Sequence, residues 1–183
     1  LYEKLGSLVS GDTLVLAGSV PNSMPEDIYE KILKRLYGKG IRFVVDATND
    51  LLLNVLKYKP FLIKPNIHEL EEIIGRELKT DEQIVTAAKE LQEKGAVNVL
   101  VSLGKDGAML IDEYGEIHKQ SALGGKPINT VGAGDSMVAG FIAGAAKSYA
   151  EALLSGSAAG GATACNKGLA TKQDIEDLLK SQK

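Results

Sequence analysis

The stretch that decides the fold is Asn129-Thr-Val-Gly-Ala-Gly-Asp-Ser-Met-Val-Ala-Gly-Phe141. A Gly-Ala-Gly turn opens an apolar helical segment and sets one carboxylate, Asp135, in its first turn. The backbone amides of Gly132, Ala133 and Gly134 are expected to be unpaired at the positive end of the helix dipole, where they can hold a phosphate or its transition state. Asp135 can then take a proton from an attacking hydroxyl. The stretch therefore predicts a phosphoryl-transfer centre.

Two commoner phosphate-binding motifs do not fit this stretch. A dinucleotide fingerprint requires glycine at the sixth position of G-x-G-x-x-G, and Met137 stands there. A Walker A loop requires Gly-Lys followed by Ser or Thr, whereas the nearby sequence is Gly124-Gly-Lys-Pro127. In a simpler alternative, Asp135 only complements the helix dipole, a contribution of about 0.3–1 kcal/mol, and the glycines only form a tight turn. Glycine costs about 1 kcal/mol against alanine inside a helix, which favours a close backbone approach instead.

The same stretch resembles the C-terminal signature of the ribokinase-like sugar kinases. The closest resemblance is to the phosphofructokinase B branch, which contains 1-phosphofructokinase and tagatose-6-phosphate kinase. It implies that Asp135 is the catalytic base and contacts the sugar, and that Gly132, Ala133 and Gly134 form an anion hole for the transferring phosphoryl group. Further segments match the family in the expected order, so that the resemblance extends over nearly the whole chain. These segments are Gly18-Ser-Val-Pro21, Lys64-Pro-Asn-Ile-His-Glu69, Val101-Ser-Leu-Gly-Lys-Asp-Gly107 and Ala162-Thr-Ala-Cys-Asn166.

The resemblance assigns these segments to binding roles. It places Ser19 in the substrate-side loop and Asn166 on the helix that flanks the adenine of ATP. The loop from Ser102 to Gly107 borders the nucleotide, and Gly104 allows a close approach. The residues implied at that loop are Ser102, Leu103, Gly104, Lys105, Asp106 and Gly107. Without the resemblance, the same loop is an ordinary turn between two apolar strands.

Asn66 and Glu69 are predicted to lie one turn apart at the start of a helix, so that both side-chain oxygens can face one point. This arrangement suits a hydrated Mg²⁺ ion, which one or two carboxylates and the substrate phosphates usually hold. Lys64, just before the helix, can reach a nucleotide phosphate. The alternative is a capping pair with Asn66 as N-cap and Glu69 at the third helical position. The two interpretations are compatible, and the family resemblance favours the metal site.

Alternating strands and helices predict an α/β fold, a three-layer α/β/α sandwich of ribokinase type with a mostly parallel sheet and an antiparallel edge. Short apolar runs indicate strands buried on both faces, and helical spacing with caps indicates the helices. The expected strands are Thr13–Ala17, Arg42–Asp46, Phe61–Ile63, Val97–Ser102, Ala108–Asp112 and Gly115–Lys119. The expected helices are Pro25–Tyr37, Asn66–Ile74, Thr80–Lys94, Ala133–Lys147, Tyr149–Cys165 and Lys172–Lys180.

Composition limits the class of protein. The length and the 44% hydrophobic content fit one globular domain over residues 1–183. A net charge of −3 without a basic cluster argues against nucleic-acid binding, and no apolar run is long enough for a membrane span. The single cysteine, Cys165, fits a reducing cytoplasm and is expected to be a buried spectator. His68 and His118 lack further ligands for zinc, and His68 is expected to be exposed.

The chain begins with Leu1 in what resembles the middle of the kinase, so the N-terminal part and lid of the family are expected to be missing. The resemblance implies a sugar-phosphate kinase that uses ATP and Mg²⁺, converting fructose 1-phosphate to fructose 1,6-bisphosphate. Tagatose-6-phosphate kinase is the alternative within the same chemistry, and a non-catalytic nucleotide-binding module is the alternative outside it. We expect a homodimer at full length. By themselves, these residues are expected to be inactive.

Overall fold

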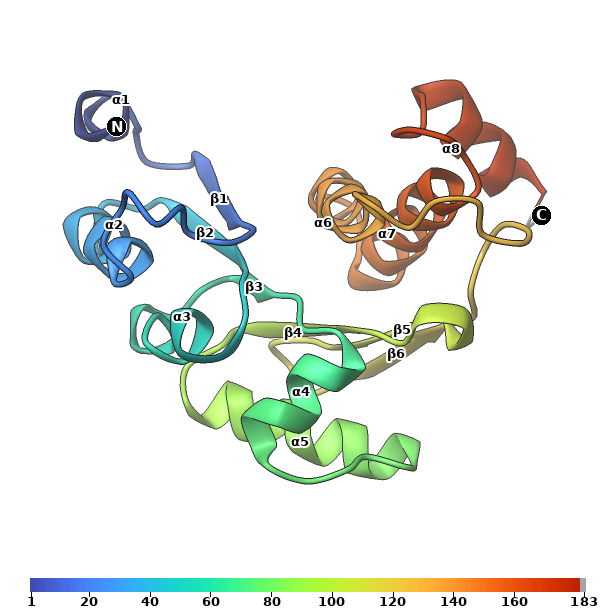
Figure 1. Ribbon diagram of the computed structural model, residues 1–183, viewed down its shortest axis with the longest axis horizontal. Coiled ribbons are helices and arrows are strands. Elements are labelled where there is room, and N and C mark those ends of the chain that lie inside the picture. The colour runs from blue at the N-terminus through green and yellow to red at the C-terminus, as the bar shows by residue number, and fades with distance from the viewer. Residues whose placement is uncertain (182–183) are drawn as a thin grey trace. The chain divides into compact units, whose positions relative to one another are not determined.

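A computed structural model describes residues 1–181 and divides the chain into two compact units, Leu1–Leu100 and Val101–Lys183 (Figure 1). The sequence-based expectation of a single domain over residues 1–183 stays a prediction.

The first unit is built on four parallel strands that pair in chain order. They are β1 (Thr13–Ala17), β2 (Arg42–Asp46), β3 (Leu62–Ile63) and β4 (Asn98–Ser102), whose last two residues pass the unit boundary. All four expected strands are confirmed to within one residue at each end. Parallel strands place their carboxyl ends at one edge, where ligands of α/β proteins usually bind.

β1 is less buried than the sequence suggests. Its apolar run predicts burial on both faces, yet only Leu16 is buried and Val15 is 42% exposed. Among the described residues β1 pairs with β2 alone, whereas β2 has strands on both sides and buries Phe43, Val44 and Val45. Within residues 1–181 β1 thus has a neighbouring strand on one side only, which accompanies the exposure of its apolar side chains.

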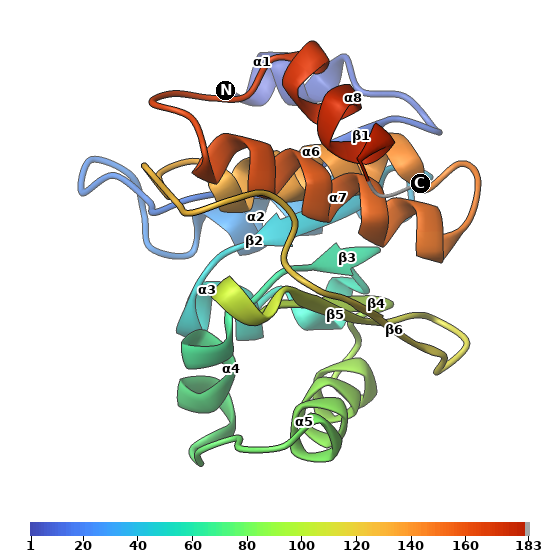
Figure 2. The same cartoon turned by 90° about the vertical axis from the view of Figure 1, so that its right-hand side faces the viewer.

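Six helical segments accompany these strands. They are α1 (Tyr2–Gly6), α2 (Ile28–Leu36), α3 (Asn49–Leu53), the 3₁₀ turn η1 (Leu56–Tyr58), α4 (Ile67–Ile74) and α5 (Asp81–Glu93). The longer three are those that the sequence predicts. α1, α3 and η1 were not predicted, because each is five residues or shorter and has no side-chain cap. α4 and α5 cover one face of β3 and β4 (Figures 1 and 2).

The second unit combines a hairpin with three helices. β5 (Ala108–Ile111) and β6 (Ile117–Gln120) are antiparallel, with Leu110 opposite His118, and the 3₁₀ turn η2 (Gly104–Asp106) precedes them. The helices are α6 (Ala133–Gly144), α7 (Tyr149–Ala164) and α8 (Lys172–Lys180). α6 ends three residues before the predicted Lys147. The extended backbone of Ser148, which caps α7, requires the chain to leave the helix first.

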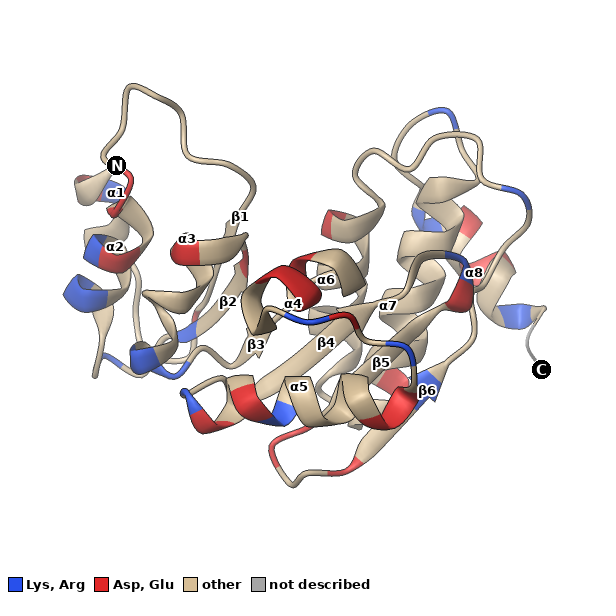
Figure 3. Cartoon of the chain, turned by 60° about the horizontal axis from the view of Figure 1, so that its bottom comes forward, with Lys and Arg blue, Asp and Glu red and all other residues tan. Residues whose placement is uncertain are grey.

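α6 and α7 lie side by side with their backbones in close approach (Figures 1 and 2). A Cβ atom on Gly140 would lie 2.5 Å from the carbonyl oxygen of Ser155, and one on Gly144 would lie 2.8 Å from the Cα of Ala152. These two glycines therefore allow α6 and α7 to pack closely. Charged side chains of both signs instead mark α2, α5 and α8, while α6 and α7 are almost free of charge (Figure 3).

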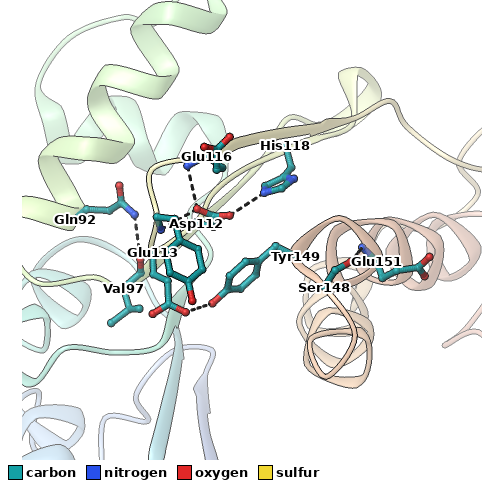
Figure 4. Close-up of polar contacts among 10 residues, drawn as sticks. Gln92, Val97, Asp112, Glu113, Glu116, His118, Ser148, Tyr149 and Glu151 are labelled. Carbon is teal, nitrogen blue, oxygen red and sulfur yellow. Dashed lines mark hydrogen bonds and ion pairs between the residues drawn. The ribbon is translucent and has the colours of Figure 1, made fainter.

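The turn between β5 and β6 is organised by a buried carboxylate. Asp112 accepts hydrogen bonds from the amides of Tyr114 (2.9 Å) and Glu116 (3.0 Å), and its other oxygen lies 2.9 Å from His118 Nε2 (Figure 4). Next to it, the Tyr149 hydroxyl donates to Glu113 at 2.5 Å. The bond between Tyr149 and Glu113 fixes the hairpin turn to the first turn of α7, and Asp112 is the side-chain partner of His118.

Candidate functional site

The turn before α6 has the geometry that the sequence predicts. Gly132 is the N-cap of α6 in the left-handed conformation, with φ of 79°. A Cβ atom at this position would also lie 2.7 Å from Leu169 Cδ2. The backbone angle therefore favours glycine, whereas the contact could be relieved by a movement of the exposed Leu169 side chain.

Most of the amides at this helix start are free. Within residues 1–181, the amides of Gly132, Gly134 and Asp135 have no hydrogen-bond acceptor. The amide of Ala133 differs from the expectation, because it donates to the carbonyl oxygen of Thr130 at 3.2 Å. This bond closes the turn that leads into the helix. The amides left free to bind a ligand are thus those of Gly132, Gly134 and Asp135, so two of the three predicted donors are free and Asp135 replaces Ala133.

Asp135 lies in the first turn of α6 and is exposed. Its side chain makes no hydrogen bond or ion pair with any described residue. The helix dipole stabilises its negative charge at this position. An exposed, unpaired carboxylate beside free amides can accept a proton from a hydroxyl that approaches an anion held there.

Two residues that the sequence analysis left without a role hold this turn in place. Asn129 donates to the carbonyl oxygen of Lys167 (3.2 Å), accepts from the amide of Val131 (3.0 Å), and its own amide bonds to Ala164. The buried hydroxyl of Thr163 donates to Ser136 Oγ at 2.9 Å and accepts from the amide of Ala170. The polar residue type at the start of the signature is the only sequence signal for Asn129.

A pocket of about 530 Å³ opens within the second unit next to this turn. Its walls come from the loop before β5, a connecting segment around Leu123, the start of α6 and the C-terminal half of α7. Most of the wall residues are small or apolar. They include Ala122, Leu123, Gly124, Met137, Gly160, Gly161 and Ala164. Such a pocket suits a flat, apolar group with an anion at its α6 end.

The structure brings four of the six predicted residues of the nucleotide loop to this pocket. Ser102, Gly104, Lys105 and Gly107 line it, as do Ala133 and Gly134, while Leu103 and Asp106 do not. Asn166 lines a neighbouring pocket of about 350 Å³, which shares Gly124, Gly125 and Cys165 with the first. The side chain of Asn166 donates to Asp174 Oδ2 at 3.1 Å and so connects the end of α7 to α8.

Cys165 differs from the sequence-based expectation of a buried spectator. Its side chain is only partly buried, lines both pockets and accepts a hydrogen bond from the amide of Gly125 at 3.2 Å. The close approach of the connecting segment to α7 explains this position. A Cβ atom on Gly161 would lie 2.1 Å from the carbonyl oxygen of Leu123.

The predicted substrate residue Ser19 lines a different pocket, of about 750 Å³, within the first unit. This pocket lies after the carboxyl ends of β1 and β2 and is lined by polar residues, including Asn22, Asn49 and Asn54. Glu26, Asp27 and Asp50 also line it, and no lysine or arginine does. The walls therefore suit the hydroxyl groups of a ligand better than a phosphate.

Lys64 is buried in the first unit, and its ammonium group lies 3.2 Å from the carboxylate of Asp46. Asp46 ends β2, and Lys64 directly follows β3, so the neighbouring parallel strands place the two side chains together. His68 is the second residue of α4, and its side chain is 84% exposed, as expected.

Asn66 and Glu69 form a full capping box at the start of α4. Asn66 Oδ1 accepts from the amide of Glu69 at 3.0 Å, and Glu69 Oε2 accepts from the amide of Asn66 at 2.8 Å. The capping alternative is therefore present. It leaves Glu69 Oε1 without a protein partner in the described part of the chain, so a metal role remains compatible with the cap. In that same part, no three His, Cys, Asp or Glu side chains converge on one point.

Comparison with known proteins gives a consistent result. Residues 2–176 match the family model described as pfkB family carbohydrate kinase. The chain is 42% identical over 183 residues to a 1-phosphofructokinase of Bacillus subtilis and 38% identical over 172 residues to a D-tagatose-1-phosphate kinase of Bacillus licheniformis. These alignments cover 99% and 92% of this chain but 60% and 56% of the relatives.

Solved structures show the same likeness. Phosphofructokinase-2 of Escherichia coli, solved with substrates and products, superposes with a TM-score of 0.90 at 32% identity, over 98% of this chain and 60% of the other. A ribokinase of Arabidopsis thaliana in complex with ribose and ATP gives a TM-score of 0.79 at 25% identity, over 92% and 55%. These matches confirm the predicted ribokinase-like α/β fold. The chain spans about 60% of the length of the relatives it matches.

No helix among residues 1–181 is long and apolar enough to cross a membrane.

Proposed function

Because this chain belongs to the pfkB family of carbohydrate kinases, we propose that it carries the nucleotide site and the catalytic base of a sugar-phosphate kinase. One observation supports the proposal most. The pocket in the second unit has small apolar walls, and free amides lie at the adjacent helix start, beside an exposed carboxylate. A nucleotide has a matching distribution of groups, with a flat base at one end and phosphates at the other.

In the proposed mechanism the protein contributes position and charge. The amides of Gly132, Gly134 and Asp135 stabilise the negative charge that develops on the transferred phosphoryl group. The carboxylate of Asp135 orients the sugar hydroxyl and takes its proton as the oxygen attacks phosphorus. Lys105, an exposed residue that lines the pocket, would neutralise phosphate charge. ADP leaves with the pair of electrons from the broken bond.

Mg²⁺ would supply further neutralisation of phosphate charge. Glu69, with one oxygen outside the capping box, fits a hydrated ion that is held through water. Asn66 would orient Glu69 through the box and contribute its amide oxygen through a bound water. Lys64 is proposed to act on a nucleotide phosphate, and Ser19 on the sugar.

The proposed substrate is fructose 1-phosphate, which would be converted to fructose 1,6-bisphosphate. The identity of 42% to a 1-phosphofructokinase supports this choice. The tagatose kinase among the relatives is named for the 1-phosphate, whereas our sequence-based alternative was tagatose-6-phosphate kinase. Both tagatose phosphates therefore belong in the substrate panel.

The full-length protein is proposed to be a homodimer in the cytoplasm. Sedimentation of a full-length chain would test the oligomeric state.

A second candidate is a nucleotide-binding module without kinase activity. The observation that favours it is that the whole nucleotide pocket lies in Val101–Lys183, while Ser19, Asn66 and Glu69 lie in the other unit. Such a module would bind ATP without forming ADP in response to any sugar phosphate.

The experiment compares the 183-residue chain with a chain extended to the length of its relatives. Calorimetry measures MgATP binding to each, and a coupled ADP assay measures turnover with fructose 1-phosphate and the two tagatose phosphates. We expect both chains to bind MgATP and only the extended chain to turn over, because poor sugar positioning removes most of the proximity contribution. ATP binding without sugar-dependent ADP formation in the extended chain would favour the second candidate. A folded 183-residue chain that does not bind nucleotide would contradict the proposed site.

A further inference from the structure

One hydroxyl group in the second unit has no partner. Ser157, in the middle of α7, is 4% exposed, and its Oγ atom is buried without a hydrogen bond to any described residue. Buried hydroxyl groups are nearly always hydrogen-bonded, so an unpaired one calls for an explanation. Ser157 also lines the 530 Å³ pocket.

Another residue of the same helix shows that buried hydroxyl groups of α7 do not generally lack a hydrogen bond. The hydroxyl of Thr163, buried to a similar degree, bonds to Ser136 and to the amide of Ala170. The other residues through which α7 lines the pocket are Gly160, Gly161 and Ala164, which have no polar side-chain atom. Ser157 therefore supplies the single hydroxyl on the α7 wall of the pocket.

We propose that the Ser157 hydroxyl is a specificity-determining hydrogen-bond partner of the purine base of the nucleotide. This inference rests on the proposed function. Rotation about χ1 moves Oγ between staggered positions, so a ligand in the pocket can recruit the hydroxyl without movement of the backbone. A base is favoured over a phosphate because the free amides for an anion lie at the start of α6, whereas small apolar residues surround Ser157.

This role also gives a reason for keeping a buried polar group that is unsatisfied without ligand. A site that is built to hydrogen-bond one group discriminates against ligands that lack the group, because its own polar atom then stays unpaired. The unpaired hydroxyl lowers the stability of the ligand-free protein, and pairing with the base recovers that loss.

The test uses the 183-residue chain and its Ser157→Ala variant, with calorimetry of MgATP and of magnesium tripolyphosphate, which has no base. We expect Ser157→Ala to weaken MgATP binding roughly threefold to tenfold, as for loss of one hydrogen bond, and to leave tripolyphosphate binding unchanged. The melting temperature of the ligand-free variant should equal or exceed that of the wild type, because an unpaired buried group has been removed.

Two further variants provide controls. Ser155→Ala makes the same change two residues away, at a side chain that faces Gly144 of α6 and does not line the pocket, and should leave MgATP binding unchanged. Ser157→Cys keeps nearly the same volume with a much weaker hydrogen bond, and should resemble Ser157→Ala. Wild-type affinity in Ser157→Cys together with a loss in Ser157→Ala would show that volume matters instead, and would overturn the inference.

The outcomes separate this inference from the proposed function. If the wild-type chain binds MgATP and Ser157→Ala binds it equally well, the inference is wrong and the proposed nucleotide site stands. An equal loss for tripolyphosphate would also overturn the inference, because the effect would not involve the base. If the folded wild-type chain binds neither ligand, the proposed nucleotide site fails, and the inference fails with it.

Discussion

The two units differ in how they treat their candidate site residues. In the second unit two donors of the pocket lining are free, namely the amide of Gly134 and the hydroxyl of Ser157, and the amide of Gly132 next to them is free as well. In the first unit the charged candidates already have protein partners. Lys64 pairs with Asp46, and Glu69 is part of the capping box of α4. A ligand in the second unit gains hydrogen bonds directly, whereas a ligand in the first unit has to share or replace existing ones.

Substitutions at free groups and at paired groups are therefore expected to have different consequences. A free group makes no hydrogen bond or ion pair that holds the fold together, so its substitution should affect binding or turnover. A paired group contributes to the fold as well, and its substitution mixes two effects.

The largest effect is expected for Asp135→Asn. Because Asp135 is exposed and unpaired, the variant should lose no more stability than the helix-dipole contribution of about 0.3–1 kcal/mol and should keep its affinity for MgATP, while turnover of an extended chain falls at least about 10²-fold through loss of the general base. Steady-state kinetics and calorimetry measure the two quantities. Glu151→Gln is the matched control, since Glu151 lies in the first turn of α7 as Asp135 does in α6. Near-normal turnover of Asp135→Asn would remove the residue from its proposed role.

Lys64→Met tests the paired side of the comparison. Removing the ammonium leaves the Asp46 carboxylate in a largely buried site, where the side chains of the pair are 7% and 16% exposed. We expect a loss of about 3 kcal/mol in the free energy of unfolding, as for other broken buried pairs. Chemical denaturation measures it. Lys57→Met breaks the more exposed pair with Glu30 and should cost less than about 1 kcal/mol.

The nucleotide role of Lys64 has a separate readout. If its ammonium also contacts a phosphate, Lys64→Met should weaken MgATP binding under conditions where the variant is fully folded. The double variant Lys64→Met, Asp46→Asn should recover part of the stability and none of the affinity. Unchanged MgATP affinity in the folded variants would leave Lys64 with the structural pairing alone.

Glu69→Gln separates the metal role from the cap. The capping box of α5 already uses Gln83 with Thr80, so a glutamine can fill the same place in α4. Only the charge at the helix start is lost, which costs about 0.3–1 kcal/mol at most. In an extended chain, the magnesium concentration for half-maximal rate should rise, because a carboxylate ligand becomes neutral. A magnesium titration that matches the wild type would show that Glu69 is a cap and nothing more.

Local patterns explain how much of the fold the sequence predicts. The six expected strands and the six longer helices appear within a few residues of their predicted bounds, since caps and apolar periodicity are local signals. α1 and α3 are not predicted, because a segment of five residues is too short to show the apolar periodicity of a helix. The exposure of β1 depends on which strands pair with it, and no pattern within Thr13–Ala17 contains that information.

The candidate site follows the same rule. The free amides at Gly132 and Gly134 and the loop around Gly104 were predictable, because a glycine turn before a helix has local consequences. The pairing of Lys64 with Asp46 joins two strands and could not be read from either one. Ser157 gave no signal at all, since a serine inside a helix is ordinary until its unpaired hydroxyl is found at a pocket wall.

The smallest effect concerns α8 and acid. Hydrogen bonds from the backbone and then the side chain of Thr171, and further from Asn166, lower the pKa of Asp174 below its ordinary value of 3.8. A lowered pKa in the folded state means that the carboxylate stabilises the protein above about pH 3.8, and that this contribution disappears as the pH falls below it.

Because Asp174 also binds Asn166 next to the pocket, acid should loosen α8 and the end of α7 together. The protection of the α8 amides, meaning their exchange rate relative to the intrinsic rate at the same pH, should therefore decrease at low pH in the wild type, while Asp174→Asn should show the lower protection already at neutral pH. Asp177→Asn, at an exposed position later in the same helix, should exchange like the wild type at neutral pH. Equal exchange in Asp174→Asn and the wild type at neutral pH would show that the capping box of α8 does not stabilise the pocket wall.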